Sequence, residues 1–303
     1  MDIGMNSTIR SINLPKNEHG TPTPLRYPGG KSAIAGLMTK VVRNSANFDR
    51  GIKTYVEPYA GGAGAAVSLL LSGTVDTIVI NDLDKAVYSF WDSVKYRPEK
   101  LIGLIQGSEI NMDQWYKQKE IYTIQETKSA QDRLNLAFAF FFLNRTNRSG
   151  ILQAGVIGGK EQTGTYKIDA RFKKDILIAK IAAIAKHRKS IVIKNNDGIA
   201  VFKEYKNRTD TLVYLDPPYV QQGKNLYLNF FNEDAHRLLA KESACTDENA
   251  NWIITYDDDS LVRELYSSGN LYQYRLRYTA QEKRHANELL ICSNAVDPVI
   301  LEN

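Results

Sequence analysis

The stretch TYVEPYAGGAGAAVSLLL, residues 54–71, reads as a short strand, a glycine-rich turn and an apolar helix. The strand is expected over Thr54–Glu57, because β-favouring residues lead into Pro58, which cannot continue a hydrogen-bonded ladder. Gly61 and Gly62 would let the backbone approach a ligand closely, with the N–H groups of the helix beyond them. A tight packing turn explains the glycines equally well, so the neighbouring sequence has to decide.

The next strand, in DTIVINDLD at residues 76–84, ends in acids. Asp82 follows Gly61 by 21 residues, an offset at which an acid accepts hydrogen bonds from ribose hydroxyls. Turn and acid together favour a nucleoside-bearing cofactor over simple packing. Because GxGxxG does not occur here, a single nucleoside is favoured over a dinucleotide, and a nucleotide-dependent oxidoreductase is disfavoured.

Further strands and helices alternate on both sides of a long helical stretch. The helix KAVYSFWDSVKY follows the second strand, and strands return after residue 190 in SIVIKN, TLVYLD, NWIITYD, YQYRLRY and ELLICS. This pattern predicts a doubly wound α/β sheet. We expect a flexible N-terminal arm over residues 1–23, a core made of residues 24–97 and 191–303, and a mainly helical, basic insertion over residues 98–190.

Composition sets limits on function. A 43% hydrophobic content indicates a globular protein, and a net charge of +5 permits an anionic partner without requiring one. The two cysteines and four scattered histidines match no metal or disulfide framework, so no metal is expected and each histidine is interpreted as a surface or capping residue. The absence of a signal peptide or long apolar run predicts a soluble, cytoplasmic protein. GKS at residues 30–32 lacks the glycine of a phosphate loop, because Leu25 occupies that position.

YLDPPYV, residues 214–220, ends a buried strand with an acid, two prolines and a phenol. A plain strand exit would explain the prolines. If the substrate is an exocyclic amine on a purine, Asp216 and the carbonyl of Pro217 can each accept one N–H, which draws the nitrogen lone pair out of the ring plane. Pro217 and Pro218 fix the direction of that carbonyl, and Tyr219 stacks on the base. Position and electrostatics suffice for such chemistry.

Seven blocks in a fixed order carry a family resemblance. LRYPGGKS, YVEPYAGGAG, INDLD, YLDPPYV, FFNEDAHRLLA, WIITYDDD and NELLICSN together resemble the Dam-type N6-adenine DNA methyltransferases, over about residues 25–294. The resemblance implies a Rossmann-like methyltransferase core, S-adenosylmethionine as donor and adenine in double-stranded DNA as acceptor. The target base would have to leave the stack to reach Tyr219.

The resemblance also implies roles for individual residues. Tyr27 and Lys31 would contact the methionine end of the cofactor, Asp82 its ribose and Asp197 its adenine, while Asp216 would lie between cofactor and target. The other expected cofactor-binding residues are Pro28, Gly29, Gly30, Glu57, Tyr59, Gly61 and Gly62.

The insertion takes the place of the family's target-recognition domain. In NRTNRSG, residues 144–150, Arg145 and Arg148 suit phosphate or guanine, while Asn144 and Asn147 suit adenine edges; Lys160 is a further expected DNA contact. A polar helix end is the alternative interpretation. The glycine-rich AGVIGGKEQTG does not read as the hairpin of the best-known members, which leaves the recognition sequence open.

Three questions of function stay open from the sequence. One alternative is the same chemistry on RNA. Another is a DNA-binding regulator without catalysis, and the intact DPPY and GGK motifs argue against that regulator. A restriction–modification role is one expectation among several, and a monomer is the expected state.

Overall fold

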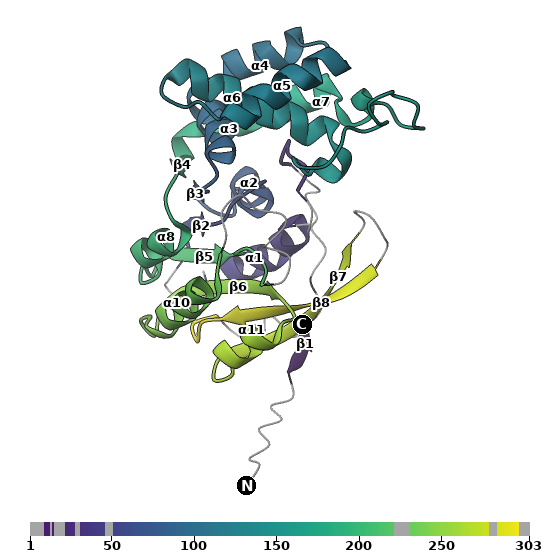
Figure 1. Ribbon diagram of the computed structural model, residues 1–303. Helices are drawn as coiled ribbons and strands as arrows, with labels where there is room; N and C mark the ends of the chain where they lie inside the picture. Colours follow the sequence, from purple (N-terminus) through teal and green to yellow (C-terminus); the bar gives the residue numbers. More distant parts are fainter. Residues whose placement is uncertain are drawn as a thin grey trace.

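The computed structural model describes residues 9–12, 14, 22–27, 31–45, 51–220, 231–278 and 284–296. Within them, one eight-stranded sheet runs through the molecule in the order β1-β7-β8-β6-β5-β2-β3-β4 (Figure 1). The strands are β1 (Arg10–Ile12), β2 (Thr54–Glu57), β3 (Thr77–Asn81), β4 (Ile191–Lys194), β5 (Thr211–Leu215), β6 (Asn251–Asp257), β7 (Asn270–Tyr278) and β8 (Arg284–Cys292).

Strand order confirms the doubly wound fold. From β2 the chain adds β3 and β4 in parallel on one side, and it then returns to add β5 and β6 in parallel on the other side. The order therefore reverses between β2 and β5, which is where ligands bind in open α/β sheets, outside the carboxyl ends of the strands. The last strand, β8, is antiparallel to both β6 and β7.

Alternation along the strands produces two apolar faces. Tyr55 and Leu212 belong to one buried cluster, while their neighbours Val56 and Val213 belong to the other, because successive side chains point to opposite sides of a sheet. Helices α1 (Lys31–Ser45), α2 (Gly64–Leu71) and α3 (Lys85–Tyr96) contribute to the first cluster. Helices α8 (Gly198–Tyr205), α10 (Glu233–Ala244) and α11 (Ser260–Leu265) contribute to the second.

The expected insertion forms a helical layer, drawn in teal at the top of Figure 1. It contains α4 (Pro98–Gly107), α5 (Met112–Ile124), α6 (Ala130–Thr146) and α7 (Lys174–Lys186), with 3-10 turns at Arg148–Gly150, Ile168–Arg171 and Arg188–Ser190. Helix α3 packs into this layer, since Phe90 stacks on Phe141 of α6 at 5.8 Å between ring centroids. The insertion therefore shares its core with the first face of the sheet, and a boundary at Pro98 falls within packed helices.

Two local expectations differ from the structure or are refined by it. The loose arm expected over residues 1–23 is interrupted at Arg10–Ile12, which pair in parallel with β7 and bury Ile12; three residues are too few to show a period in the sequence. The glycine-rich stretch after Gly150 forms a succession of turns, with an isolated bridge between Asn147 and Val156.

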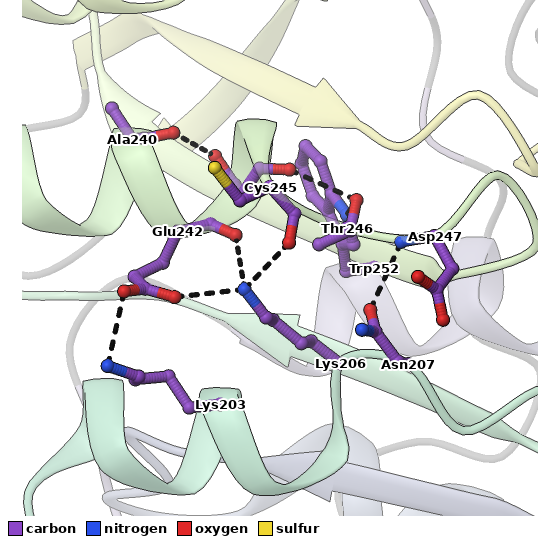
Figure 2. Close-up of polar contacts among 10 residues, drawn as sticks. Lys203, Lys206, Asn207, Ala240, Glu242, Cys245, Thr246, Asp247 and Trp252 are labelled. Carbon is purple, nitrogen blue, oxygen red and sulfur yellow. Dashed lines mark hydrogen bonds and ion pairs between the residues drawn. The ribbon is translucent and has the colours of Figure 1, made fainter.

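Helices α8 and α10 are joined by a buried lysine (Figure 2). Lys206 Nζ donates to the backbone oxygens of Glu242 and Cys245 and to the Glu242 carboxylate, at 2.8–2.9 Å. A cation at the carboxyl end of α10 satisfies terminal carbonyls and complements the helix dipole. In the described part of the chain, every helix is too short or too polar to cross a lipid bilayer.

Candidate active site

The glycine turn after β2 is closely covered by an aromatic ring. Gly61 has φ +48°, and a Cβ there would lie 2.6 Å from the ring of Tyr27. At Gly62 the same ring would be 3.1 Å away. Trp91 Nε1 donates to the carbonyl of Gly61 at 3.0 Å. Only glycine allows both this conformation and this close approach.

Asp82 closes the same turn from β3. Its Oδ2 accepts from the backbone N–H of Gly61 at 2.8 Å, and its Oδ1 accepts from that of Asp84 at 3.0 Å. A carboxylate oxygen has two lone pairs and can accept more than one hydrogen bond. The spacing of 21 residues recognised in the sequence thus corresponds to direct contact.

Glu57 lies buried at the end of β2. It is 1% exposed, and its Oε1 accepts from the N–H of Ala66 in the first turn of α2 at 3.0 Å. Burial raises the pKa of Tyr55, and the charges of Glu57 and Asp216 raise it further, so both carboxylates lie within electrostatic reach of this hydroxyl. Glu57 ends β2 and Asp216 directly follows β5, and these two strands are parallel neighbours in the sheet.

The turn after β4 completes this edge of the sheet. Gly198 packs against Tyr59, since a Cβ at Gly198 would lie 2.4 Å from that ring. Asp197 is the N-cap of α8, with its carboxylate accepting from Ala200 N at 2.9 Å. Burial raises the pKa of Tyr59, and the charge of Asp197 raises it further.

Asp216 follows β5 and is held by a neighbour on β6. Thr255 Oγ1 donates to Asp216 Oδ1 at 3.2 Å. Three residues on, the hydroxyl of Tyr219 donates to Oε2 of the buried Glu288 at 3.0 Å. The DPPY motif is thus supported from both β6 and β8.

The expected amide readers of DNA lie inside the protein. Asn144 and Asn147 are each 1% exposed. Asn144 bonds the backbone of Arg26 and Gly150, and Asn147 accepts from Trp115 Nε1 and donates to the carbonyls of Ile151 and Leu152. In this arrangement both amides hold the loop, and the expectation that they face base edges is not supported.

The two arginines of NRTNRSG differ in their surroundings. Arg145 donates through Nε and Nη2 to the carbonyl of Arg171 and through Nη1 to that of Pro24. Burial, then the charges of Arg26 and Arg171, lower the pKa of Arg145 to about 10. Arg148 is exposed, as is Lys160 in the following loop.

Several residues at this edge carried no signal in the sequence reading. Thr255 and Glu288 are polar residues within largely apolar strands. A polar residue in such a strand is the sequence feature that could have identified them. His236 was interpreted as a surface or capping residue, which is wrong: it is 2% exposed and its Nδ1 lies 2.9 Å from Tyr256 Oη. His236 lies in α10, and its ring packs against the ring of Phe231, with 4.7 Å between the two centroids.

Some expected residues lie outside this description. Pro28, Gly29 and Gly30 are not among the described residues, and for Lys31 the structure describes the backbone at the start of α1 only. Within the described ranges, no cluster of three or more histidine, cysteine or acidic side chains is arranged to hold a metal ion.

The two sides of the switch point have complementary chemistry. Gly61 and Asp82 lie in contact at the ends of β2 and β3, and Asp216 directly follows β5, the strand on the other side of β2. The doubly wound sheet with its switch point between β2 and β5 makes this a Rossmann-like α/β protein.

The comparison with known families gives the particular class. The family described as D12 class N6 adenine-specific DNA methyltransferase matches residues 27–281, and the chain belongs to it. The protein is therefore an enzyme that methylates N6 of adenine in DNA, and membership implies S-adenosylmethionine as the methyl donor.

Individual relatives are more distant. The chain is 26% identical over 231 residues to the Type II methyltransferase M.MjaIII of Methanocaldococcus jannaschii, an overlap of 72% of this chain and 77% of that protein. Among solved structures, the rRNA methyltransferase aviRa of Streptomyces viridochromogenes is 11% identical with a TM-score of 0.38, over 92% of this chain and 90% of that one. A score at this level establishes nothing further about the fold.

Proposed function

We propose that the substrate is a flipped adenine in double-stranded DNA, and that Asp216 and the Pro217 carbonyl accept its two amine protons. The observation that carries the proposal is the place of Asp216, at the carboxyl end of β5 with its carboxylate fixed by Thr255. An aromatic plate follows in Tyr219, whose ring is oriented by the bond from its hydroxyl to Glu288.

The cofactor site is proposed to lie on the β2 side of the switch point. When bound, S-adenosylmethionine supplies a methyl group on a positively charged sulfur. Asp82 and the Gly61–Gly62 turn suit the ribose and the neighbouring backbone, and Glu57 gives this site a buried carboxylate. Tyr27, Tyr59, Asp197 and the segment Pro28–Lys31 complete the proposed set.

The chemistry assigned to the protein is orientation of the amine. Methylation would replace one proton of the amine nitrogen with a methyl group, whose bond to sulfur would break, and Asp216 would be the hydrogen-bond acceptor for the proton that leaves. Hydrogen bonds from the amine to two fixed oxygens raise the availability of the lone pair, without a nucleophile on the protein.

Binding of duplex DNA is proposed for the side where the insertion meets residues 22–27. Arg26, Arg145, Arg171 and Lys180 gather there. Burial lowers the pKa values of Arg26, Arg145 and Lys180, and the neighbouring charges that lower them further are all cationic. Such a cluster is complementary to a polyanion. Arg148 and Lys160, both exposed, are the proposed readers of base or phosphate, and the Type II name of the relative favours a site-specific modification role.

Methyl transfer by an Asp216→Ala variant tests this proposal. Loss of the acceptor should cost about 3 kcal/mol or more in transition-state stabilisation, a hundredfold or greater in rate. Glu248→Ala, an exposed acid, is the control and should match the wild-type protein. Near-normal transfer by folded Asp216→Ala would reject the role of Asp216.

The same assay compares duplex DNA, single-stranded DNA and RNA of one sequence. The proposal expects the highest kcat/KM on duplex DNA. Equal or faster transfer to RNA would favour the RNA alternative, and tight DNA binding without transfer by the wild-type protein would favour a silent regulator.

A further inference from the structure

Two buried hydroxyl groups lie in line behind Asp216. Tyr214 Oη lies 2.8 Å from Thr255 Oγ1, which in turn donates to Asp216 Oδ1 at 3.2 Å. Tyr214 is 3% exposed and Thr255 is 1% exposed. Thr255 enters the proposal above only as the donor to Asp216, and Tyr214 has no role in it.

Strand register explains why these groups meet. β5 and β6 are parallel, with Tyr214 opposite Ile253 and Leu215 opposite Ile254. Since alternate residues share a face, Tyr214 on β5 and Asp216, the residue directly after β5, point to the same side of the sheet as Thr255 on β6. Thr255 therefore lies beside Asp216. It is a polar residue that follows two apolar ones, Ile253 and Ile254, in β6.

Hydrogen counting fixes the direction of the chain. A carboxylate oxygen is an acceptor, so the single hydroxyl hydrogen of Thr255 is given to Asp216. The hydrogen between Tyr214 and Thr255 must then come from Tyr214. Burial and the nearby charge of Asp216 raise the pKa of Tyr214, so this phenol keeps the proton that it donates. Hydrogen bonds in such a series polarise one another in the interior.

We infer that Thr255 is a positioning residue for methyl transfer, oriented by Tyr214 and acting by fixing the plane of the Asp216 carboxylate toward the amine. This inference rests on the proposed role of Asp216. A carboxylate at a strand end can rotate about its last bond, and one hydrogen bond from a buried, β-branched neighbour restricts that rotation. Displacement of a catalytic group by about 1 Å can cost about a hundredfold in rate.

A set of near-isosteric variants separates the hydroxyl from the shape of the side chain. Thr255→Val removes the hydroxyl and should lower kcat by about 10- to 100-fold, with the KM values for DNA and S-adenosylmethionine changed less than about twofold. Thr255→Ser restores the donor and should recover kcat to within about threefold of wild type. Tyr214→Phe leaves the Thr255 donor in place and should cost less, about 2- to 5-fold.

The double variant Tyr214→Phe/Thr255→Val controls for stability. Thr255→Val alone leaves the Tyr214 hydroxyl buried without its partner, whereas removal of both hydroxyls can be nearly neutral for folding. The double variant should therefore unfold at a temperature nearer to wild type than Thr255→Val does. Its kcat should nevertheless stay as low as that of Thr255→Val.

The outcomes are distinguishable from failure of the proposed function. Full activity of Asp216→Ala would reject the proposed role of Asp216 itself. If Asp216→Ala is inactive and Thr255→Val keeps kcat within about twofold of wild type, the positioning role alone is rejected. Thr255→Ser as slow as Thr255→Val, or a double variant that recovers kcat along with stability, would likewise overturn it.

Discussion

Asn144 forms hydrogen bonds with both the N–H and the carbonyl of Arg26. Its Oδ1 accepts from Arg26 N at 2.8 Å and its Nδ2 donates to Arg26 O at 2.7 Å, across 118 residues of sequence. The same short segment reaches the cofactor side, because Thr23 Oγ1 donates to the carbonyl of Gly62 at 2.6 Å. Residues 22–27 therefore connect the insertion to the glycine turn through side-chain hydrogen bonds to both, so a change in the insertion can affect the conformation of that turn.

Gly150→Ala tests how closely this segment is docked. Gly150 has φ +77°, and a Cβ there would lie 2.6 Å from the backbone oxygen of Arg26. Gly159 has the same φ of +77° with nothing within 4 Å of its Cβ, so Gly159→Ala is a matched control for backbone strain alone. Strain at such a φ costs about 1–2 kcal/mol.

The clash at Gly150 should add about 1–3 kcal/mol to that strain, as forced overpacking does. Urea unfolding of the two variants gives the difference. Calorimetry should also find weaker S-adenosylmethionine binding in Gly150→Ala only. Equal destabilisation by both variants would mean that Arg26 moves aside without cost.

Asp82→Ala should weaken S-adenosylmethionine binding by about 1–3 kcal/mol, because it removes an acceptor and frees the amide of Gly61. Isothermal titration calorimetry measures the affinity directly. Asp76→Ala is the control, since Asp76 is exposed just before the opposite end of β3 and should leave affinity unchanged. Equal affinities of wild type and Asp82→Ala would place the ribose elsewhere.

Arg145 and Arg148 should separate in a comparison of alanine variants. Arg145 donates to two backbone carbonyls, so its loss should lower the melting temperature as well as DNA affinity. Arg148 is exposed, and its loss should leave the melting temperature unchanged.

If Arg148 reads guanine, Arg148→Ala should relax preference at one base pair by about 1–3 kcal/mol. If it contacts phosphate, affinity should fall equally on all sequences and the salt slope should shrink by about one. Methylation rates on singly altered duplexes across a salt series decide between these. Wild-type specificity and salt slope together would show that this loop does not contact DNA.

Much of the fold could be predicted because its signals are local. The strand expected at Thr54–Glu57, the helix KAVYSFWDSVKY and the five later strands all occur as expected. Gly61 and Asp82, singled out in the sequence by their spacing, are found in contact, because parallel strands end at one edge of the sheet.

The remainder depends on contacts between distant segments. Asn144 was expected to read DNA because amides suit base edges, but it bonds the backbone of Arg26, 118 residues away, and no local pattern encodes that contact. Thr255 and His236 are typical of surfaces as residue types, and only the register of β6 and the packing of α10 bury them. Burial of polar groups is a tertiary property.

Lys206→Met should destabilise the protein by about 2–4 kcal/mol, because it removes a buried cation from three oxygen acceptors (Figure 2). Lys203→Met is a matched control. Lys203 pairs with the same Glu242 at 3.2 Å, but its side chain is 54% exposed, and such pairs contribute about 0–1 kcal/mol. Urea midpoints measure both, and similar losses would show that burial of Lys206 adds nothing.

His236 should make stability depend on pH. Burial lowers the pKa of His236 below its ordinary value of 6.5, although Asp259 and Glu233 oppose that shift. Below pH 6.5 the unfolded chain therefore binds more protons than the folded chain at this residue. Its contribution to stability is complete above about pH 6.5 and is lost as the pH falls from there to the folded-state pKa.

A non-titrating variant isolates this contribution from those of the carboxylates. His236→Gln keeps a hydrogen-bonding side chain near Tyr256 but cannot take up a proton, so its stability should fall less steeply than wild type between about pH 6.5 and 5, where one such group contributes at most about 1.4 kcal/mol per pH unit. Tyr256→Phe removes the partner hydroxyl and keeps the imidazole, so it should lower stability at every pH while retaining a downward slope. Urea unfolding of the three proteins at about pH 7.5, 6.5, 6.0, 5.5 and 5.0 gives the slopes. Parallel curves for wild type and His236→Gln would mean that this buried imidazole does not control acid stability.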